Sequence, residues 1–210
     1  MKNWNAKEQH ITRGILRIAG IAALGIGFTF AAPRTTHAQV VTPPVPDNIK
    51  VPATAEAFLI GRGVGTQNYV CAPSRSIGHV AFTLFTPQAT LFDDHGGQLT
   101  THFFSPNPFE NGVVRATWES SVDTSTVWAR AAASSVDPAF ITPGAIPWVL
   151  LPVVGAQAGP TGGNTLSGTT FIQRVNTVGG AAPDTGCNLP TDIGTKVFVP
   201  YTADYIFYKN

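Results

Sequence analysis

The chain has 210 residues, a formal net charge of +1 at pH 7 and only 12% charged residues. The first 38 residues hold five of the 13 Lys and Arg residues and one of the 12 Asp and Glu residues, so the other 172 carry eight basic and 11 acidic residues. Nucleic-acid binding requires clusters of Lys and Arg that neutralise phosphates, so this balance argues against a nucleic-acid partner. The length of the remainder suits one domain.

Residues 1–38 have the pattern of a secretory signal peptide. Basic residues come first, an apolar run over residues 18–32 follows, and Thr36-His37-Ala38 ends the segment with small residues at the two positions that a signal peptidase reads. The run is shorter than the ~20 residues that a membrane span needs, and no later segment is long and apolar enough. We expect cleavage near Ala38-Gln39, export to the periplasm or out of the cell, and no integral membrane segment after cleavage. An uncleaved N-terminal anchor is the alternative.

Export determines what is expected of the two cysteines, Cys71 and Cys187. Thiols in an oxidising compartment form disulfides by default, so we expect a bond between these two residues. Free or intermolecularly bonded thiols are the alternative.

After the leader, residues 39–52 contain four prolines and predict an extended spacer, followed by a β domain over residues 53–210. Residues 61–65 (GRGVG) superficially resemble a phosphate-binding loop. They lack the Lys-Ser/Thr pair of such loops, so we interpret them as a flexible connection between strands.

Alternation of apolar and polar residues with a period of two dominates the rest of the chain. It is clearest over residues 79–85, 113–118, 171–176 and 197–208. Turn residues separate these stretches, and Asn111-Gly112 is typical of a two-residue hairpin. The pattern predicts eight to ten short antiparallel strands, arranged as a single-domain β-sandwich or a jelly-roll-like barrel.

The densest group of potential ligands is Asp93-Asp94-His95, with His102 seven residues later. His102 and Asp93 are therefore the candidate catalytic residues, for acid–base or metal chemistry. The competing interpretation is a turn at residues 94–97, in which aspartate accepts backbone hydrogen bonds and glycine supplies positive φ. The chain lacks metal-ligand spacings and a Gly-x-Ser-x-Gly motif, so we expect no metal and no cofactor.

Aromatic side chains are the other resource of the sequence. Phe104, Phe109, Trp118 and Trp128 lie in the middle third of the chain. Exposed on a sheet, they could stack on sugar rings or dock a partner protein. Trp118 and Trp128 are expected in the core, whereas Phe104 and Phe109 fit either role.

Five segments of the chain carry a resemblance to a known family. They are GTQNYVC (65–71), ATLFD (89–93) with Gly96 and His102 after it, IPWVLL (146–151), FIQRVNTVGGAAP (171–183) ending at Cys187, and VPYTADYIFY (199–208). Together they resemble the exported family called domain of unknown function 3455, found in bacteria and fungi. The likeness covers roughly residues 50–208.

The resemblance implies an exported β-rich domain with a Cys71–Cys187 bridge, and it brings no catalytic residue. One departure is the stretch FFSPNPF (103–109), where a Gly-Pro-Thr-Trp segment is expected. Within the family motif, Gln173 and Arg174 point to opposite faces of a strand. We expect them to form a structural network, with Asp93, Asp204 or backbone carbonyls as partners of Arg174, and a binding site is the alternative.

The leading functional hypothesis is a non-enzymatic binding protein at the cell envelope, with a carbohydrate or a protein as its ligand. The alternative is a secreted hydrolase or metal-dependent enzyme that uses His102 and Asp93. A third is a structural protein that assembles through edge strands. The sequence indicates no oligomeric state.

Overall fold

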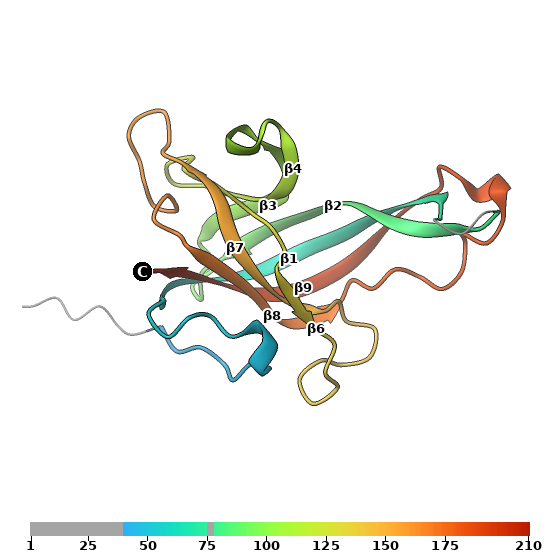
Figure 1. The fold of residues 1–210 in the computed structure, drawn as a ribbon, viewed down its shortest axis with the longest axis horizontal. Helices are drawn as coiled ribbons and strands as arrows, with labels where there is room; N and C mark the ends of the chain where they lie inside the picture. Colours follow the sequence, from blue (N-terminus) through green and yellow to red (C-terminus); the bar gives the residue numbers. More distant parts are fainter. Residues whose placement is uncertain (1–39, 75–77) are drawn as a thin grey trace, which may run out of the picture. The chain divides into compact units, whose positions relative to one another are not determined.

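Nine β-strands and three short 3-10 helices make up the described part of the chain, residues 40–74 and 78–210 of a computed structural model (Figure 1). The described residues belong to one compact unit, Ala38–Asn210. The predicted leader and its cleavage site lie outside the described residues. In the part that is described, no helix has the length and apolar character that a membrane span requires.

The strands alternate with turns along the whole unit. Their bounds are β1 Glu56–Pro73, β2 Val80–Phe92, β3 Gln98–Asn107, β4 Val113–Ser120, β5 Thr126–Ala129, β6 Ala133–Ser135, β7 Trp148–Gln157, β8 Phe171–Gly179 and β9 Lys196–Lys209. The 3-10 helices are η1 Asp47–Ile49, η2 Pro108–Glu110 and η3 Pro190–Asp192.

The strands form one antiparallel sheet in the order β5-β4-β3-β2-β1-β9-β8-β7-β6, and β5 also pairs with β7. That pairing closes eight strands into a barrel, while β6 adds three residues along the same edge of β7. The all-β antiparallel prediction is confirmed, but the fold is neither a sandwich nor a jelly roll, because a single sheet closes on itself through the pairing of β5 with β7. The strands are also longer than expected: β1 has 18 residues.

The glycines of residues 61–65 lie inside β1 and not in a flexible connection. A Cβ at Gly61 would come within 2.8 Å of Leu91, and one at Gly63 within 2.8 Å of the Tyr205 ring. At Gly65 it would come within 2.1 Å of a backbone oxygen of β2. The absence of side chains on this face therefore lets large residues of β2 and β9 fill the barrel interior.

A second apolar cluster lies outside the barrel. Ile49 is fully buried and packs there with Trp148 and Ile206. Part of the predicted spacer is therefore folded onto the barrel wall. Gln173 strengthens this contact, because its side-chain amide donates to the Ile49 carbonyl (2.6 Å) and accepts a hydrogen bond from the Tyr208 hydroxyl.

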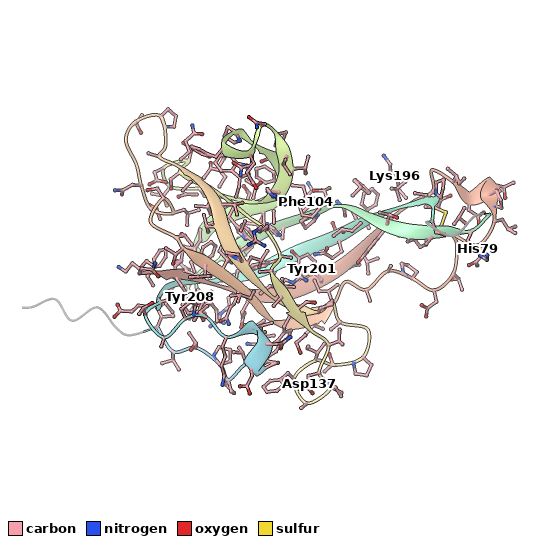
Figure 2. All side chains as sticks on the ribbon, in the orientation of Figure 1. His79, Phe104, Asp137, Lys196, Tyr201 and Tyr208 are labelled. Carbon is pink, nitrogen blue, oxygen red and sulfur yellow. A yellow bond between two sulfur atoms is a disulfide. The ribbon has the colours of Figure 1, made fainter. Side chains whose placement is uncertain are left out.

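Three strands continue beyond the barrel as an arm (Figure 1). β2 pairs with β3 only from Ala89 onward and β8 reaches β9 only as far as Tyr201, so β2 and β9 are the edges of the arm. Cys71 and Cys187 form a disulfide there, with 5.4 Å between their Cα atoms and a sequence separation of 116 (Figure 2). The bridge is as expected and points to an oxidising environment.

Two predicted turns have different outcomes. At residues 93–97 the Asp93 carboxylate accepts from the amides of His95 (2.8 Å) and Gly97 (2.7 Å), which confirms the turn. Asn111-Gly112 is not a two-residue hairpin. The connection from β3 to β4 also contains η2, and Asn111 has a φ of 53°.

Candidate ligand-binding cavity

A cavity of about 300 Å³ lies in the barrel interior, toward the end from which the arm extends. All eight barrel strands contribute to its lining. The lining residues are Gln67, Leu84, Pro87, His102, Phe104, Val114, Arg115, Ala116, Trp118, Ala129, Arg130, Ala131, Val149, Leu151, Arg174 and Tyr205. Figure 2 labels Phe104 and Tyr201 in the barrel, and Lys196 and His79 along the arm.

The cavity exists because the interior changes along the barrel axis. At the far end the inward positions carry large apolar side chains that are fully buried, such as Leu91, Ile172 and Phe207. At the cavity the inward positions of β4 and β5 carry Ala116 and Ala129, which are paired to each other. The small side chains at these positions leave the cavity open, whereas the large side chains at the far end fill the interior.

His102 forms one wall of the cavity. Its side chain is 3% exposed, its ring stacks on Trp118 at a centroid distance of 4.2 Å, and its Nδ1 lies 2.9 Å from the Thr117 carbonyl. Burial lowers the pKa of His102 to about 3, with the nearby positive charge of Arg174 lowering it further and the bond to Thr117 opposing the shift. The imidazole is therefore neutral at pH 7. Because a carbonyl only accepts, Nδ1 carries the proton and Nε2 is an acceptor.

Arg174 brings a positive charge into this interior. It is half-buried, and its Nε (3.3 Å) and Nη2 (2.9 Å) both donate to the Pro147 carbonyl. Within residues 40–74 and 78–210, no carboxylate lies within ion-pair distance of it. Of the partners expected for it, backbone carbonyls are present, whereas Asp204 pairs with Arg62 (2.8 Å) and Asp93 caps its turn.

Two tyrosines of β9 complete the polar part of the interior. The hydroxyls of Tyr201 and Tyr205 are 2.8 Å apart. Burial raises the pKa of both phenols, and the charge of Arg174 acts in the opposite direction on each. Both tyrosines are therefore neutral at pH 7, because the guanidinium of Arg174 does not offset the effect of burial on either pKa.

Two buried hydrogen-bond donors in the lining have no acceptor in the described structure. They are Nε2 of Gln67, whose residue is 1% exposed, and Nε1 of Trp118, whose residue is fully buried. The side chain of Gln67 lies close enough to the Tyr201 hydroxyl to oppose the rise in the pKa of that phenol, but the contact does not have the geometry of a hydrogen bond. Most buried polar atoms of native proteins are paired, and an unpaired one costs roughly 1–3 kcal/mol. Donors without partners beside a cavity indicate where a ligand acceptor would be bound.

The charge of the lining is one-sided. Three arginines contribute to it and no Asp or Glu does. Arg115 is neutralised by Glu110 through bonds of 2.7 Å, and these bonds, with one from Asn107, lower the pKa of Glu110 to about 2. Arg130 and Arg174 have no carboxylate partner in the described ranges. The cavity therefore has a net positive lining in a domain whose formal charge is negative.

The predicted catalytic pair is not brought together. His102 is opposite Ala89 in the sheet and points inward, whereas Asp93 comes four residues after Ala89, just beyond the end of β2, with its carboxylate on the outer turn. Four residues of strand correspond to ~13 Å. Among the described residues, no group of three or more His, Cys, Asp or Glu side chains could hold a metal ion.

The four aromatic candidates divide into two pairs. Phe104 and Trp118 line the cavity. Trp128 is buried on the outer face, where its Nε1 donates to Ser105 (2.9 Å) and its ring meets that of Phe109 edge-on at 6.1 Å. Phe109 is 58% exposed.

Gln67, Tyr201 and Tyr205 are site residues that were not predicted from the sequence. A signal for them was present, because Gln67 follows Gly61, Gly63 and Gly65 at the same period of two. The alternation of residues 197–208 likewise places Tyr201 and Tyr205 on one face. What was missing was the knowledge that this face lines a closed barrel.

A family model described as protein of unknown function (DUF3455) matches residues 52–209. The chain belongs to this family. The match confirms the resemblance noted in the sequence, and every residue that lines the cavity falls inside it. Searches of curated proteins and of solved structures found no match.

Proposed function

We propose that this DUF3455 protein is a non-enzymatic binding protein that holds a small, largely apolar molecule inside its barrel. The observation that carries the proposal is the cavity of about 300 Å³ with unpartnered donors in its lining. That volume is at the lower end of the range for small-molecule pockets, and eight-stranded barrels have room for one small ligand. The analogy to other barrels concerns architecture only.

In this proposal the ligand lies inside the barrel, whereas the sequence suggested a ligand on the surface. A carbohydrate or a protein bound by exposed aromatics is the expectation from the sequence, yet Trp118 and Trp128 are buried and Phe109 alone is well exposed among the four candidates. A cavity of about 300 Å³ accepts a small molecule but is too small for a segment of a partner protein. We keep the expected location outside the cytoplasm, in the periplasm or secreted, which the disulfide supports.

The enzyme hypothesis gains no support from the site. His102 is neutral and stacked on Trp118, and its Nδ1 is occupied by a backbone carbonyl. A general base is usually oriented by a carboxylate and lies beside a nucleophile. Neither accompanies His102 among the residues that line the cavity.

A neutral fluorescent probe tests the proposal. Titration of the mature protein with N-phenyl-1-naphthylamine should show saturable binding of one molecule per chain. Ala129→Phe should abolish it, because Ala129 is 1% exposed and lines the cavity. Val178→Phe, at a position 61% exposed on β8, is the matched control and should bind normally. Near-ultraviolet circular dichroism checks that both variants are folded. Equal binding by a folded Ala129→Phe variant would place the probe elsewhere and refute the proposal.

A further inference from the structure

We infer that the ligand of the barrel carries a carboxylate, which Arg174 and Gln67 bind while its apolar body lies along the opposite wall. This inference rests on the proposed function, because it names the chemistry of the molecule in the same cavity. It concerns the head group of the ligand, whereas the proposed function concerns only its presence.

The positive charge of Arg174 in the barrel interior favours an anionic ligand. Arg174 places a cation in an interior that contains neutral His102, Tyr201 and Tyr205 and no carboxylate within ion-pair distance. Its two bonds to the Pro147 carbonyl satisfy hydrogen bonds but leave its charge unneutralised. Burying a cation without an anion is costly, so a ligand anion at this position would offset that cost. An amine or other cation would add to it.

The unpartnered atoms of the lining favour the same head group, independently of charge. Nε2 of Gln67 and Nε1 of Trp118 are donors with no acceptor in the described structure. Both side chains lie in the lining with Arg174, and both are buried to nine-tenths or more. A ligand that satisfies them must present acceptor oxygens. A carboxylate does so with two oxygens and no competing donor.

The number of available donors favours a carboxylate over a phosphate. Nε and Nη2 of Arg174 already donate to one carbonyl, so the guanidinium keeps only its remaining N–H groups for a ligand. Gln67, on β1, adds an amide N–H to the same lining. Such a set suits a monoanion with two oxygens. A phosphate, with three or more oxygens and nearly two charges, would be better matched by two buried cations, and of the two arginines without a carboxylate partner in the described ranges Arg130 is exposed.

The rest of the lining defines the body of the ligand. Leu84, Phe104, Val149 and Leu151 present apolar surface, and the His102–Trp118 stack presents an aromatic face. Together with the volume, this describes a small aliphatic or aromatic monocarboxylic acid. A free sugar, with hydroxyls around its ring, would leave most of its polar groups against these side chains without partners.

Matched acids and amides provide the test. Benzoate, 4-phenylbutyrate and octanoate are each compared with the corresponding primary amide by isothermal titration calorimetry at pH 7. The two head groups have the same shape and differ in charge. We expect at least one acid to bind on the order of tenfold more tightly than its amide. If every amide binds as well as its acid, the inference is wrong. Inorganic phosphate, added as a competitor, should not displace the acid, and displacement would also contradict it.

Variants then locate the head group. Arg174→Met should lose roughly tenfold or more of the affinity for the acid while N-phenyl-1-naphthylamine still binds. Lys196→Met removes a positive charge from an exposed residue of β9 outside the lining and is the control, with a loss of about threefold or less. A folded Arg174→Met variant that still prefers the acid over the amide would overturn the assignment.

A second variant protects the test against misfolding. If Arg174→Met does not fold, Gln67→Met decides, since it removes only an unpartnered amide and should weaken the acid several-fold with the neutral probe unaffected. No change in acid affinity in Gln67→Met would then overturn the inference. The two proposals fail in different ways, because binding of the neutral probe without preference for acids refutes the carboxylate alone. Failure of the neutral probe to bind inside the barrel refutes the proposed function.

Discussion

The two ends of the barrel interior are built from the same strands and serve different purposes. At the closed end, which is the end of the barrel away from the arm, Leu91, Ile172 and Phe207 are fully buried in an apolar cluster. At the end near the arm, the inward positions hold polar side chains, including Gln67, His102 and Arg174. Packing optimised for stability alone would fill both ends with apolar residues. Two unpartnered donors, Nε2 of Gln67 and Nε1 of Trp118, lie at the cavity, although Oγ1 of Thr100 and Nε1 of Trp148 are unpartnered away from it. The concentration of polar side chains at this end indicates that it is kept for a ligand.

The largest effect on stability is expected at the closed end. Phe207→Ala removes a fully buried ring and should lower the free energy of unfolding by about 3–5 kcal/mol. Phe198→Ala on the same strand is the control, because Phe198 is 58% exposed and should change it by about 0.5 kcal/mol or less. Urea denaturation measures both. Similar losses in the two variants would mean that burial does not distinguish these positions.

The disulfide comes second. Replacing Cys71 and Cys187 together by Ser should lower the free energy of unfolding by about 2–4 kcal/mol, because the bridge constrains a long loop of the unfolded chain. The arm should also exchange its amide hydrogens faster, while the closed end of the barrel keeps its relative protection. Hydrogen exchange by mass spectrometry measures this. Faster exchange at the closed end than in the arm would contradict the separation of the two regions.

Replacing each of two buried glutamines should change the free energy of unfolding in opposite directions. Gln67 is 1% exposed with an unpartnered amide nitrogen, and Gln173 is 2% exposed with bonds to Ile49 and Tyr208. Gln67→Met should raise the free energy of unfolding by about 1 kcal/mol, because it removes an unsatisfied donor. Gln173→Met should lower it by about 1–3 kcal/mol, because it leaves the partners of the amide unpaired.

Thermal and urea unfolding of the two variants measure this difference. A destabilised Gln67→Met would mean that the amide of Gln67 has a structural partner in solution, which would weaken the case for a ligand there.

The smallest effect on stability is expected for the ion pair of Glu110 with Arg115 at the rim of the cavity, and this effect depends on pH. The pKa of Glu110 is lowered to about 2 in the folded protein from an ordinary value of 4.5, mainly by the hydrogen bond from Arg115. A lowered folded pKa means that the carboxylate contributes stability that is fully present above pH 4.5 and is lost as the pH falls toward 2. Glu110→Gln should therefore reduce the loss of stability on acidification over that range.

Urea unfolding at several pH values between 6 and 2 measures the slope. Glu119→Gln is the control, because Glu119 forms no ion pair in the described part of the chain. An unchanged slope in Glu110→Gln would show that the rim ion pair makes no measurable contribution.

Much of the fold could be predicted from local patterns. A period of two assigns residues 171–176 and 197–208 to strands and places Tyr201, Tyr205 and Phe207 on one face. The turn at Asp93 follows from short-range chemistry, since its partners lie within four residues.

The site was less accessible to the same reasoning. Proximity in sequence suggests a pairing of His102 with Asp93, but one faces the interior and the other caps an outer turn. Alternation also places Gln173 and Arg174 on opposite faces correctly, without indicating that Arg174 enters a cavity. Neither residue has a local signal for its partners, which come from segments 27 to 124 residues away.

The sequence by itself determined the all-β class, the two faces of several strands, the turn at Asp93 and membership of the DUF3455 family, but not that residues 61–65 belong to strand β1. Only the tertiary structure decided that β5 pairs with β7 and closes one sheet into a barrel, and that Gly61 and Gly63 make room for Leu91 and Tyr205 inside it. The reason is physical. Alternation is a property of each strand alone, whereas closure and the cavity depend on pairings between strands distant in sequence, which no local pattern specifies.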